Sequence, residues 1–355
     1  MIVDRSIPLK RILQIIAIMV CAGVFCSRDG SSSNQSYCKY NAEVYIDSLY
    51  LQAVMISGIK ASNHPTGTTP LLEFIERAVR SRCDDFSPEE ILGNISELFF
   101  SELDISFDSA RSDINNLFPT TIYNSKSGNC LGLSLLFLLT AQRFELPVYG
   151  VMVPGHMFVR YDDGQTQINL EMMKKGNSYP DSWYKERYPT SEYAKYDLKN
   201  LAMAEVVGLL EYNLANYYYQ LGRYDYALER YENVTGVLPH FAEAWGNYAL
   251  TLGKANRPVK ALESINTAVR LDPNLHYVNR NRGILLLQVG NFSEAVKELH
   301  YSVAQNPTDA LAMAALGTAY SGLKLSDSST IYLQKAGKID PNISIVQNSS
   351  MEKVP

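Results

Sequence analysis

Two residues whose types suit nucleophilic chemistry stand close in the sequence, Cys130 in KSGNCLGLSLLFLL and His156 in VPGHMFVRY. Cys130 comes directly before a long apolar run, so we expect it at the start of a helix, whereas a structural cysteine would usually lie within the apolar face. The positive end of a helix dipole lowers the pKa of a cysteine, and the thiolate is the nucleophile. A histidine within hydrogen-bond reach would serve as its base. The two residues therefore indicate acyl transfer through a thioester.

A third group would have to orient the histidine, and the segment QINLE supplies two candidates, Asn169 and Glu171. Side chains two positions apart on a strand share a face, so Asn169 and Glu171 are expected to point the same way. In a hairpin with the strand of His156, either side chain could accept the imidazole N–H. Spacing alone leaves both candidates open.

The elements that must position these residues begin with helices. A helix is predicted from Cys130 to residue 145, closed by Leu146-Pro147. In the helix before it, Ser87 suits the N-cap, Pro88 suits the first helical position, and acidic residues fill the first turn. The helices predicted ahead of Cys130 cover residues 43–59, 71–83 and 87–100.

After residue 147 the hydrophobic period changes to that of strands. VYGVMV, HMFVRYDDG and QTQINLE predict an antiparallel hairpin with Asp163-Gly164 at its turn. Gly128 is expected to let the chain turn into the following helix, and Gly132 to leave space for a substrate beside the thiol. The aromatic segment at residues 178–189 could line a substrate cleft, although packing between domains is the favoured interpretation. A helix carrying the cysteine thus packs on a small sheet carrying the histidine, which defines an α+β domain.

The second half of the chain repeats with a period of 34 residues. Small residues let neighbouring helices approach, and a proline ends each second helix, so four helix pairs are predicted to stack on one another. Three positions of the repeat carry the same kind of residue, proline or small, in all four units. They are Pro239, Pro273, Pro307 and Pro341; Ala215, Ala249, Gly283 and Gly317; and Ala227, Ala261, Ala295 and Ser329.

Two parts of the chain, which contain these motifs, each resemble a known family. GNCLGLSLLFLLTAQRFELPVYGVMVPGHMFVRY followed by INLEMMKKG resembles the transglutaminase-like superfamily, which is papain-like in catalytic logic, over residues 90–185. The 34-residue pattern over residues 208–341 resembles the tetratricopeptide repeat. The first resemblance implies a triad of Cys130, His156 and an acid; counted back from Gly176, Glu171 takes the place of the family's aspartate. Asn169 is then the less favoured alternative.

The expected architecture is an α+β transglutaminase-like (papain-like) domain followed by an all-α tetratricopeptide-repeat solenoid. The repeats would bind a protein substrate or partner. The predicted boundaries are a signal at residues 1–26, a tether at 27–39, the transglutaminase-like domain at 40–190, a linker helix at 191–207, four repeats at 208–341 and a tail at 342–355.

The N-terminus is typical of an export signal. Positive charges precede the apolar residues 12–25, a run that is long enough for a signal and short for a membrane-spanning helix. Cys26 follows at the place of the lipidated cysteine of a bacterial lipoprotein, although a small residue would be expected before it. We therefore expect export to the cell envelope with Cys26 lipidated; a cleaved soluble signal and an uncleaved anchor are the alternatives. Cys38 and Cys83 could then form a disulfide and leave Cys130 free.

Net charge and residue spacing also indicate which partners and cofactors are not expected. A net charge of −5 gives no reason to expect nucleic-acid binding. No Cys/His spacing suits a metal, no cofactor is implied, and a membrane is expected only through the N-terminal lipid or anchor. The chain is expected to be a peptidase, an amidase or a transglutaminase; the alternative is a catalytically inactive envelope scaffold whose repeats bind a partner protein.

Overall fold

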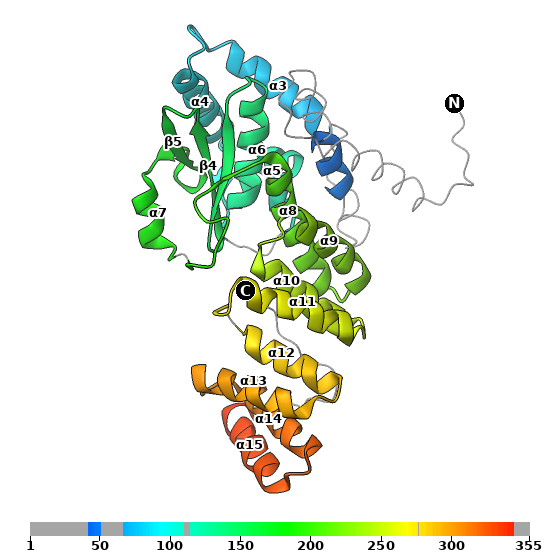
Figure 1. The fold of residues 1–355 in the computed structure, drawn as a ribbon. Helices are drawn as coiled ribbons and strands as arrows, with labels where there is room; N and C mark the ends of the chain where they lie inside the picture. Colours follow the sequence, from blue (N-terminus) through cyan, green and yellow to red (C-terminus); the bar gives the residue numbers. More distant parts are fainter. Residues whose placement is uncertain (1–41, 51–66, 110–113, 190, 276, 344–355) are drawn as a thin grey trace, which may run out of the picture. The chain divides into compact units, whose positions relative to one another are not determined.

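The computed structural model describes residues 42–50, 67–109, 114–189, 191–275 and 277–343, drawn in colour in Figure 1. The chain divides into two compact units, Met1–Thr190 with Tyr196–Leu210 and Ser191–Lys195 with Glu211–Pro355. The predicted signal, Cys26 and Cys38 lie outside the described residues.

Helices make up the first part of the first unit. Residues 42–50 are helical, and α3 (Thr68–Arg80) and α4 (Pro88–Glu97) follow. The predicted cap of α4 is confirmed: the Ser87 Oγ accepts a hydrogen bond from the Glu90 N–H at 3.3 Å, and Pro88 is the first helical residue. The chain continues through η1 (Leu98–Glu102), β1 (Ser106–Phe107), η2 (Ile114–Leu117), α5 (Pro119–Ser125) and β2 (Ser127–Gly128), with β1 parallel to β2.

A five-stranded antiparallel sheet forms the second part of this unit. Its order is β6-β5-β4-β3-β7, so the predicted strands occupy its centre. The predicted turn between β4 and β5 is confirmed, because Gly164 has a φ of +84° and the Asp163 carboxylate accepts the N–H groups of Gln165 and Thr166. The strands are β3 (Val148–Val153), β4 (His156–Asp162), β5 (Gln167–Glu171), β6 (Asn177–Ser178) and β7 (Asn200–Leu201).

The helix α6 (Cys130–Gln142) packs on β3 and β4 (Figure 1). It is apolar all round, and every residue from Leu131 to Ala141 is buried, as expected of a central core helix. A side chain at Gly150 on β3 would meet Val206 at 2.6 Å and Met157 at 2.9 Å, with Leu138 of α6 in ordinary contact at 3.6 Å, so Gly150 and Met157 lie on the face of the sheet that α6 covers. Since strand side chains alternate, the neighbours of Met157 on β4, His156 and Phe158, point to the opposite face.

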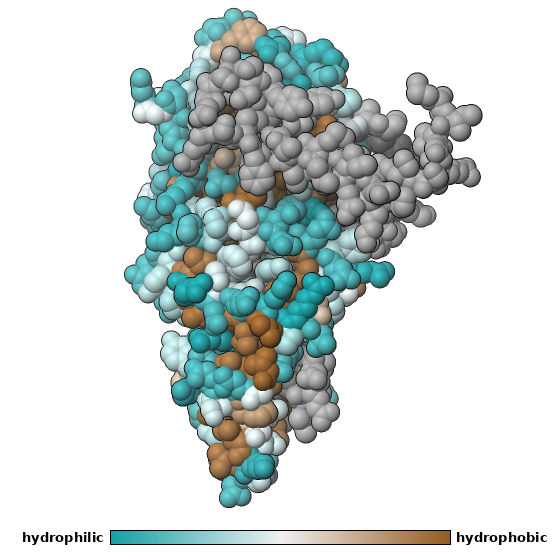
Figure 2. Space-filling model, turned by 45° about the vertical axis from the view of Figure 1, so that its right-hand side comes forward, coloured by the Kyte–Doolittle hydropathy of each residue, from teal (hydrophilic) through white to brown (hydrophobic). Residues whose placement is uncertain are grey.

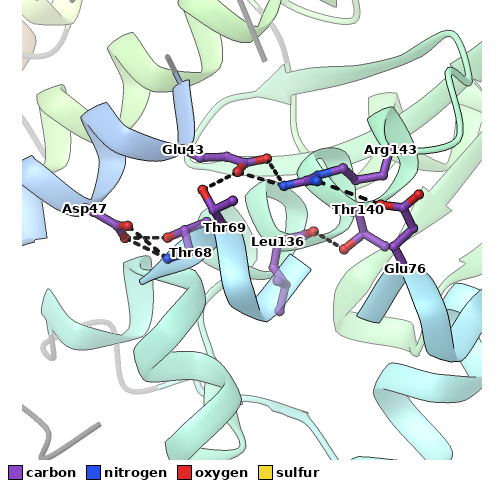
Figure 3. Close-up of polar contacts among 8 residues, drawn as sticks. All are labelled: Glu43, Asp47, Thr68, Thr69, Glu76, Leu136, Thr140 and Arg143. Atoms are coloured by element: carbon purple, nitrogen blue, oxygen red, sulfur yellow. Dashed lines mark hydrogen bonds and ion pairs between the residues drawn. The ribbon is translucent and has the colours of Figure 1, made fainter. Parts of the chain in front are cut away.

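A polar network fixes the far end of α6, where Arg143 is the C-cap (Figure 3). Arg143 Nη2 donates to both oxygens of the Glu43 carboxylate at 2.7 and 2.8 Å, and Thr69 Oγ1 donates to the same carboxylate at 2.6 Å. The Glu43 side chain is only 4% exposed, so these bonds compensate a buried charge. Asp47 caps α3 by accepting the backbone N–H and the hydroxyl of Thr68. The network joins residues 42–50, α3 and α6, and so fixes the helix that carries Cys130.

Replacing Arg143 by methionine should lower the free energy of unfolding of the first unit by about 2–3 kcal/mol, because the buried Glu43 charge would lose its main partner. Urea unfolding can be followed by the fluorescence of Trp183, after Trp245 in the second unit is replaced by phenylalanine. Arg80→Met removes a more exposed ion pair, with Glu76, and should cost under about 1 kcal/mol. Equal losses in the two variants would contradict this role of Arg143.

The second unit is all helical and consists of successive helix pairs. Each predicted proline lies two residues beyond the end of a second helix, so the predicted helix ends are confirmed. The pairs are α8 (Met203–Gln220) with α9 (Tyr224–Val237), α10 (Ala242–Lys254) with α11 (Pro258–Leu271), α12 (Val278–Gln288) with α13 (Phe292–Gln305), and α14 (Ala310–Gly322) with α15 (Ser326–Ile339). The first turns of α8, up to Leu210, belong to the first unit.

The predicted columns of small residues lie at close contacts between these helices. A side chain at Gly283 would meet Leu299 at 2.6 Å, and one at Gly317 would meet Leu333 at 2.7 Å. Ala215, Ala249, Ala227, Ala261 and Ala295 are fully buried, and Ser329 is 7% exposed. Adjacent helices from α9 to α15 pack on one another in chain order, as the 34-residue period predicts.

Candidate active site

Cys130 is the first residue of α6, as predicted. The Asn129 side chain caps the helix by accepting the Gly132 N–H at 2.8 Å. The Asn129 N–H in turn donates to the Asn116 carbonyl oxygen at 3.1 Å, so the segment η2 holds the helix start in place. One turn further on, the Ser134 hydroxyl donates to the Met157 carbonyl oxygen at 3.4 Å and ties the same side of α6 to β4. Cys130 is a free cysteine and is partly exposed.

The structure brings Cys130, His156 and Glu171 together at the end of the sheet where β4 begins. The His156 Nε2 lies 2.8 Å from a Glu171 carboxylate oxygen, and the imidazole lies close enough to the Cys130 thiol for each group to shift the pKa of the other. Because Nε2 faces the carboxylate, Nδ1 is the ring nitrogen left for the sulfur. The His156 and Glu171 side chains are 3% and 0% exposed, so their hydrogen bond is shielded from water. The second Glu171 oxygen accepts the Met173 N–H at 2.9 Å.

The strand register explains why Glu171 rather than Asn169 contacts the histidine. Arg160 is paired with Asn169 and Val159 with Leu170, so Glu171 falls level with Phe158 and lies diagonally across from His156. The Asn169 side chain instead accepts from the Arg160 Nε at 2.7 Å and donates to the Asp181 carboxylate at 2.8 Å. Asn169, the alternative partner considered from the sequence, thus belongs to a neighbouring network.

The electrostatics of the pair favour a thiolate beside an imidazolium. Burial acts to raise the pKa of Cys130, but hydrogen bonds from His156 and from the Met157 and Leu131 N–H groups, together with the charge of His156, hold it below its ordinary value. Burial acts to lower the pKa of His156, but hydrogen bonds and charges of Cys130 and Glu171 outweigh it and raise the pKa to about 9. Between these two pKa values the sulfur is charged and the imidazole holds the proton.

A short aromatic helix covers the face of the sheet that carries His156. The Tyr184 ring, on α7 (Asp181–Arg187), stacks on Phe158 with centroids 3.7 Å apart, and Tyr188, just past the helix, stacks on His156 at 4.9 Å. The start of α7 is anchored by the ion pair of Asp181 with the buried Arg160. The sequence had suggested a substrate cleft or packing between domains for this segment; in the first unit it packs on the β3–β4 hairpin. The contact of Tyr188 with the imidazole depends on how the chain folds back over the sheet and has no local signal in the sequence.

The expectation for Gly132 was wrong. A Cβ at this position would lie 2.2 Å from the Asn116 carbonyl oxygen and 3.0 Å from the Leu117 Cα, so the missing side chain makes room for η2 and not for a substrate. Gly128 is likewise buried, and a side chain there would meet Leu133 at 2.8 Å. Both glycines allow segments that flank the nucleophile to pack closely.

Gly132→Ala should destabilise the first unit by about 3 kcal/mol, because a backbone oxygen must move away from the new methyl group. Gly93→Ala in α4 is the matched control: nothing lies within 4 Å of its Cβ, so alanine should stabilise the helix by about 0.5–1 kcal/mol. Urea unfolding with the Trp183 signal measures both. A neutral or stabilising effect of Gly132→Ala would show that η2 does not lie against the helix start.

Other expected features concern the cysteines, metals and membrane. The Cys83 thiol donates to the Val79 carbonyl oxygen at 3.4 Å, and its suggested disulfide partner lies outside the described residues. Across the described ranges, no three His, Cys, Asp or Glu side chains are grouped as metal ligands would be. Within those same ranges, no helix has the length and apolar character needed to cross a membrane.

A helix-borne cysteine facing a histidine and an acid on adjacent antiparallel strands is the arrangement expected of the transglutaminase-like class. Residues 69–207 match the transglutaminase-like superfamily, and residues 212–276 and 252–316 each match the tetratricopeptide repeat. The chain therefore contains a transglutaminase-like domain followed by tetratricopeptide repeats, and both resemblances seen in the sequence are confirmed.

Solved structures show similarity over the repeats. MamA from Desulfovibrio magneticus RS-1 is 24% identical, with 38% of this chain and 76% of that chain covered at a TM-score of 0.36. YrrB, described as a tetratricopeptide-repeat protein with an unusual peptide-binding site, is 22% identical, with 39% and 74% covered and a TM-score of 0.36. No curated protein matches the sequence.

Proposed function

We propose that the chain is a thiol acyl-transfer enzyme in which Cys130 is the nucleophile, His156 the base and Glu171 the group that orients the base. The observation that carries the proposal is the Cys130 thiol beside the imidazole of His156, whose Nε2 is hydrogen-bonded to the Glu171 carboxylate. A nucleophile, a base and an orienting group in hydrogen-bond contact form the general arrangement of nucleophilic catalysis.

The chemistry follows from this arrangement. The Cys130 thiolate attacks an acyl carbonyl, the imidazolium gives its proton to the leaving group, and a thioester remains on the sulfur. The neutral imidazole then takes a proton from the acceptor that attacks the thioester, the acyl group passes to the acceptor, and the thiolate–imidazolium pair is restored. Because α6 begins at Cys130, the Cys130 N–H has no acceptor within the helix and suits an oxyanion in the transition state.

The acceptor decides which reaction results. Water as acceptor gives a peptidase or an amidase, and an amine gives a transglutaminase. We propose water, since the partial exposure of Cys130 allows it to reach the thioester. The repeats would bring a protein substrate to the site, because stacked helix pairs form extended surfaces for protein binding.

A protein scaffold is the second candidate, and the surface of the repeats favours it. Figure 2 shows hydrophobic side chains gathered over part of the helical repeats. Exposed hydrophobic side chains of this kind serve protein binding, with or without a reaction at Cys130. The exposed large hydrophobic residues of the repeats include Leu221, Tyr226, Val259, Val289, Tyr301, Leu325, Ile331 and Ile339.

Export to a bacterial envelope, with Cys26 lipidated, is a proposal that rests on the sequence of residues 1–26. The mass of the mature N-terminus tests it: a lipidated Cys26 as first residue supports it, and an intact Met1 contradicts it.

The test of the enzyme proposal uses p-nitrophenyl acetate as acyl donor for the full-length protein. Attack by Cys130 releases nitrophenolate and leaves an acetyl thioester that hydroxylamine removes and peptide mass spectrometry locates. Cys83, a partly exposed thiol of the same domain, is the internal reference. Faster acetylation of Cys130 than of Cys83 at pH 7 supports the enzyme. Equal or slower acetylation supports the scaffold.

A further inference from the structure

The Tyr184 hydroxyl is a buried polar group that no hydrogen bond in the first unit explains. The tyrosine is fully buried, and its hydroxyl oxygen has no hydrogen-bond partner among the described residues. A buried hydroxyl without a partner is unfavourable, so such groups are rare and call for an explanation. Phenylalanine would fill the same space without this disadvantage. The hydroxyl is therefore expected to serve a purpose other than packing.

The carboxylate of Glu171, a charge that acts on this hydroxyl, indicates that purpose. Burial, followed by the charge of Glu171 and the close approach of its carboxylate to the hydroxyl, raises the pKa of Tyr184, so the hydroxyl stays protonated and keeps a hydrogen to donate. The ring is held on Phe158 at 3.7 Å and 15°, and Phe158 is level with Glu171 in the strand register. The hydroxyl thus stands beside the carboxylate without the geometry of a full hydrogen bond to it. Hydrogen bonds of active sites are often long or poorly aligned in the free enzyme and tighten during the reaction.

We propose that Tyr184 is a positioning residue of the Cys130–His156–Glu171 site, whose hydroxyl donates to Glu171, already in the free protein and more closely during the reaction, and weakens the hold of the carboxylate on the imidazolium. This inference rests on the proposed acyl-transfer function. Glu171 already accepts from His156 and from the Met173 N–H. A third donor spreads the negative charge further, so the imidazolium gives up its proton to a leaving group more readily.

The titratable and charged groups around the pair come from four elements. His156 and Arg160 lie on β4, Glu171 ends β5, Cys130 begins α6, and Tyr184 lies on α7 with Tyr188 just past it. Arg160 is engaged by Asn169 and Asp181, so its charge is largely compensated. Tyr188 stacks on the imidazole ring of His156. Tyr184 is therefore the group whose hydroxyl can change how strongly the Glu171 carboxylate stabilises the imidazolium of His156.

The test compares Tyr184→Phe with Tyr218→Phe in the full-length protein. Tyr218 is also fully buried with a hydroxyl that has no partner among the described residues, but it lies in the repeat unit. The titration of His156 is followed by NMR of histidine labelled with ¹³C at the ring, with the signal assigned through His156→Ala. We expect Tyr184→Phe to raise the pKa of His156 by about 0.5–1 pH unit, because Glu171 then holds the imidazolium more strongly. Tyr218→Phe should leave it unchanged.

Thermal unfolding separates this role from packing. Both variants remove an unsatisfied hydroxyl and should melt at the same temperature as the wild type or about 2–4 °C higher. A shifted His156 titration in Tyr184→Phe alone supports the proposal. Equal His156 titrations in the wild type and Tyr184→Phe overturn it while leaving the acyl-transfer function intact. If His156 of the wild type titrates as an ordinary histidine, the proposed function itself fails, whatever Tyr184→Phe shows.

Discussion

His156→Ala is expected to slow the acylation of Cys130 by about 10²–10⁴-fold at pH 7, the usual contribution of a general base. The loss has two causes. The variant removes the group that takes the thiol proton, and it removes both the hydrogen bond and the charge that oppose the effect of burial on the Cys130 pKa. The Met157 and Leu131 N–H groups remain, so some thiolate still forms. The rate of nitrophenolate release from p-nitrophenyl acetate measures the effect.

His300→Ala is the matched control for this prediction. His300 also makes a hydrogen bond, with the Tyr320 hydroxyl at 2.6 Å, but it lies in the repeats. It should leave the acylation rate within a factor of about two of the wild type, since a general base acts only within hydrogen-bond reach of the group that it deprotonates. An acylation rate in His156→Ala equal to that of His300→Ala would show that the imidazole does not activate Cys130.

Glu171→Gln is expected to have an effect of comparable size, up to about 10⁴-fold on the acylation rate, as neutralising the orienting acid of a triad does. Glutamine keeps the shape and can still accept the Met173 N–H, but its amide can donate to the His156 Nε2. The imidazole proton then lies on Nδ1, which faces the sulfur, and the ring no longer serves as a base. Nitrophenolate release, measured against the wild type, gives the size of the loss.

The same variant should lower the pKa of His156 from about 9, because the hydrogen bond and charge of Glu171 raise it and burial lowers it. The imidazolium of Glu171→Gln therefore loses its proton at a lower pH than in the wild type. Glu186→Gln, an exposed change on α7, is the control and should alter neither the rate nor the titration. An unchanged His156 titration in Glu171→Gln would mean that the carboxylate does not stabilise the imidazolium.

The sequence predicts most of the helices, strands and turns that carry this site. The apolar run after Cys130, the alternation in HMFVRY and QINLE and the Asp163-Gly164 turn are local signals, and each corresponds to the element observed. The 34-residue columns also predict the helix ends, because proline and small residues act through local backbone and contact geometry. Cys130 and His156 could be assigned to one site because the helix and the hairpin that carry them are consecutive.

Other features depend on contacts that no local pattern contains. The choice between Glu171 and Asn169 requires the register of β4 on β5. A shift of that register by one residue would move every side chain of the strand to the other face of the sheet. Gly132 was misread because its neighbour, Asn116, comes from a separate segment. The Arg143–Glu43 pair joins residues 100 positions apart. The contact of Tyr188, just past α7, with His156 depends on how the chain returns over the sheet after β6.

The most direct test of the account is the pH dependence of Cys130 alkylation by iodoacetamide in the full-length protein, located by peptide mass spectrometry and compared with His156→Ala. The account predicts fast labelling well below pH ~8.5, where an unperturbed cysteine titrates, because the pKa of Cys130 is lowered beside His156. His156→Ala should move the onset of labelling to higher pH. Labelling that follows an ordinary thiol titration in both proteins would contradict the thiolate–imidazolium pair and leave the repeats as the functional part of the chain.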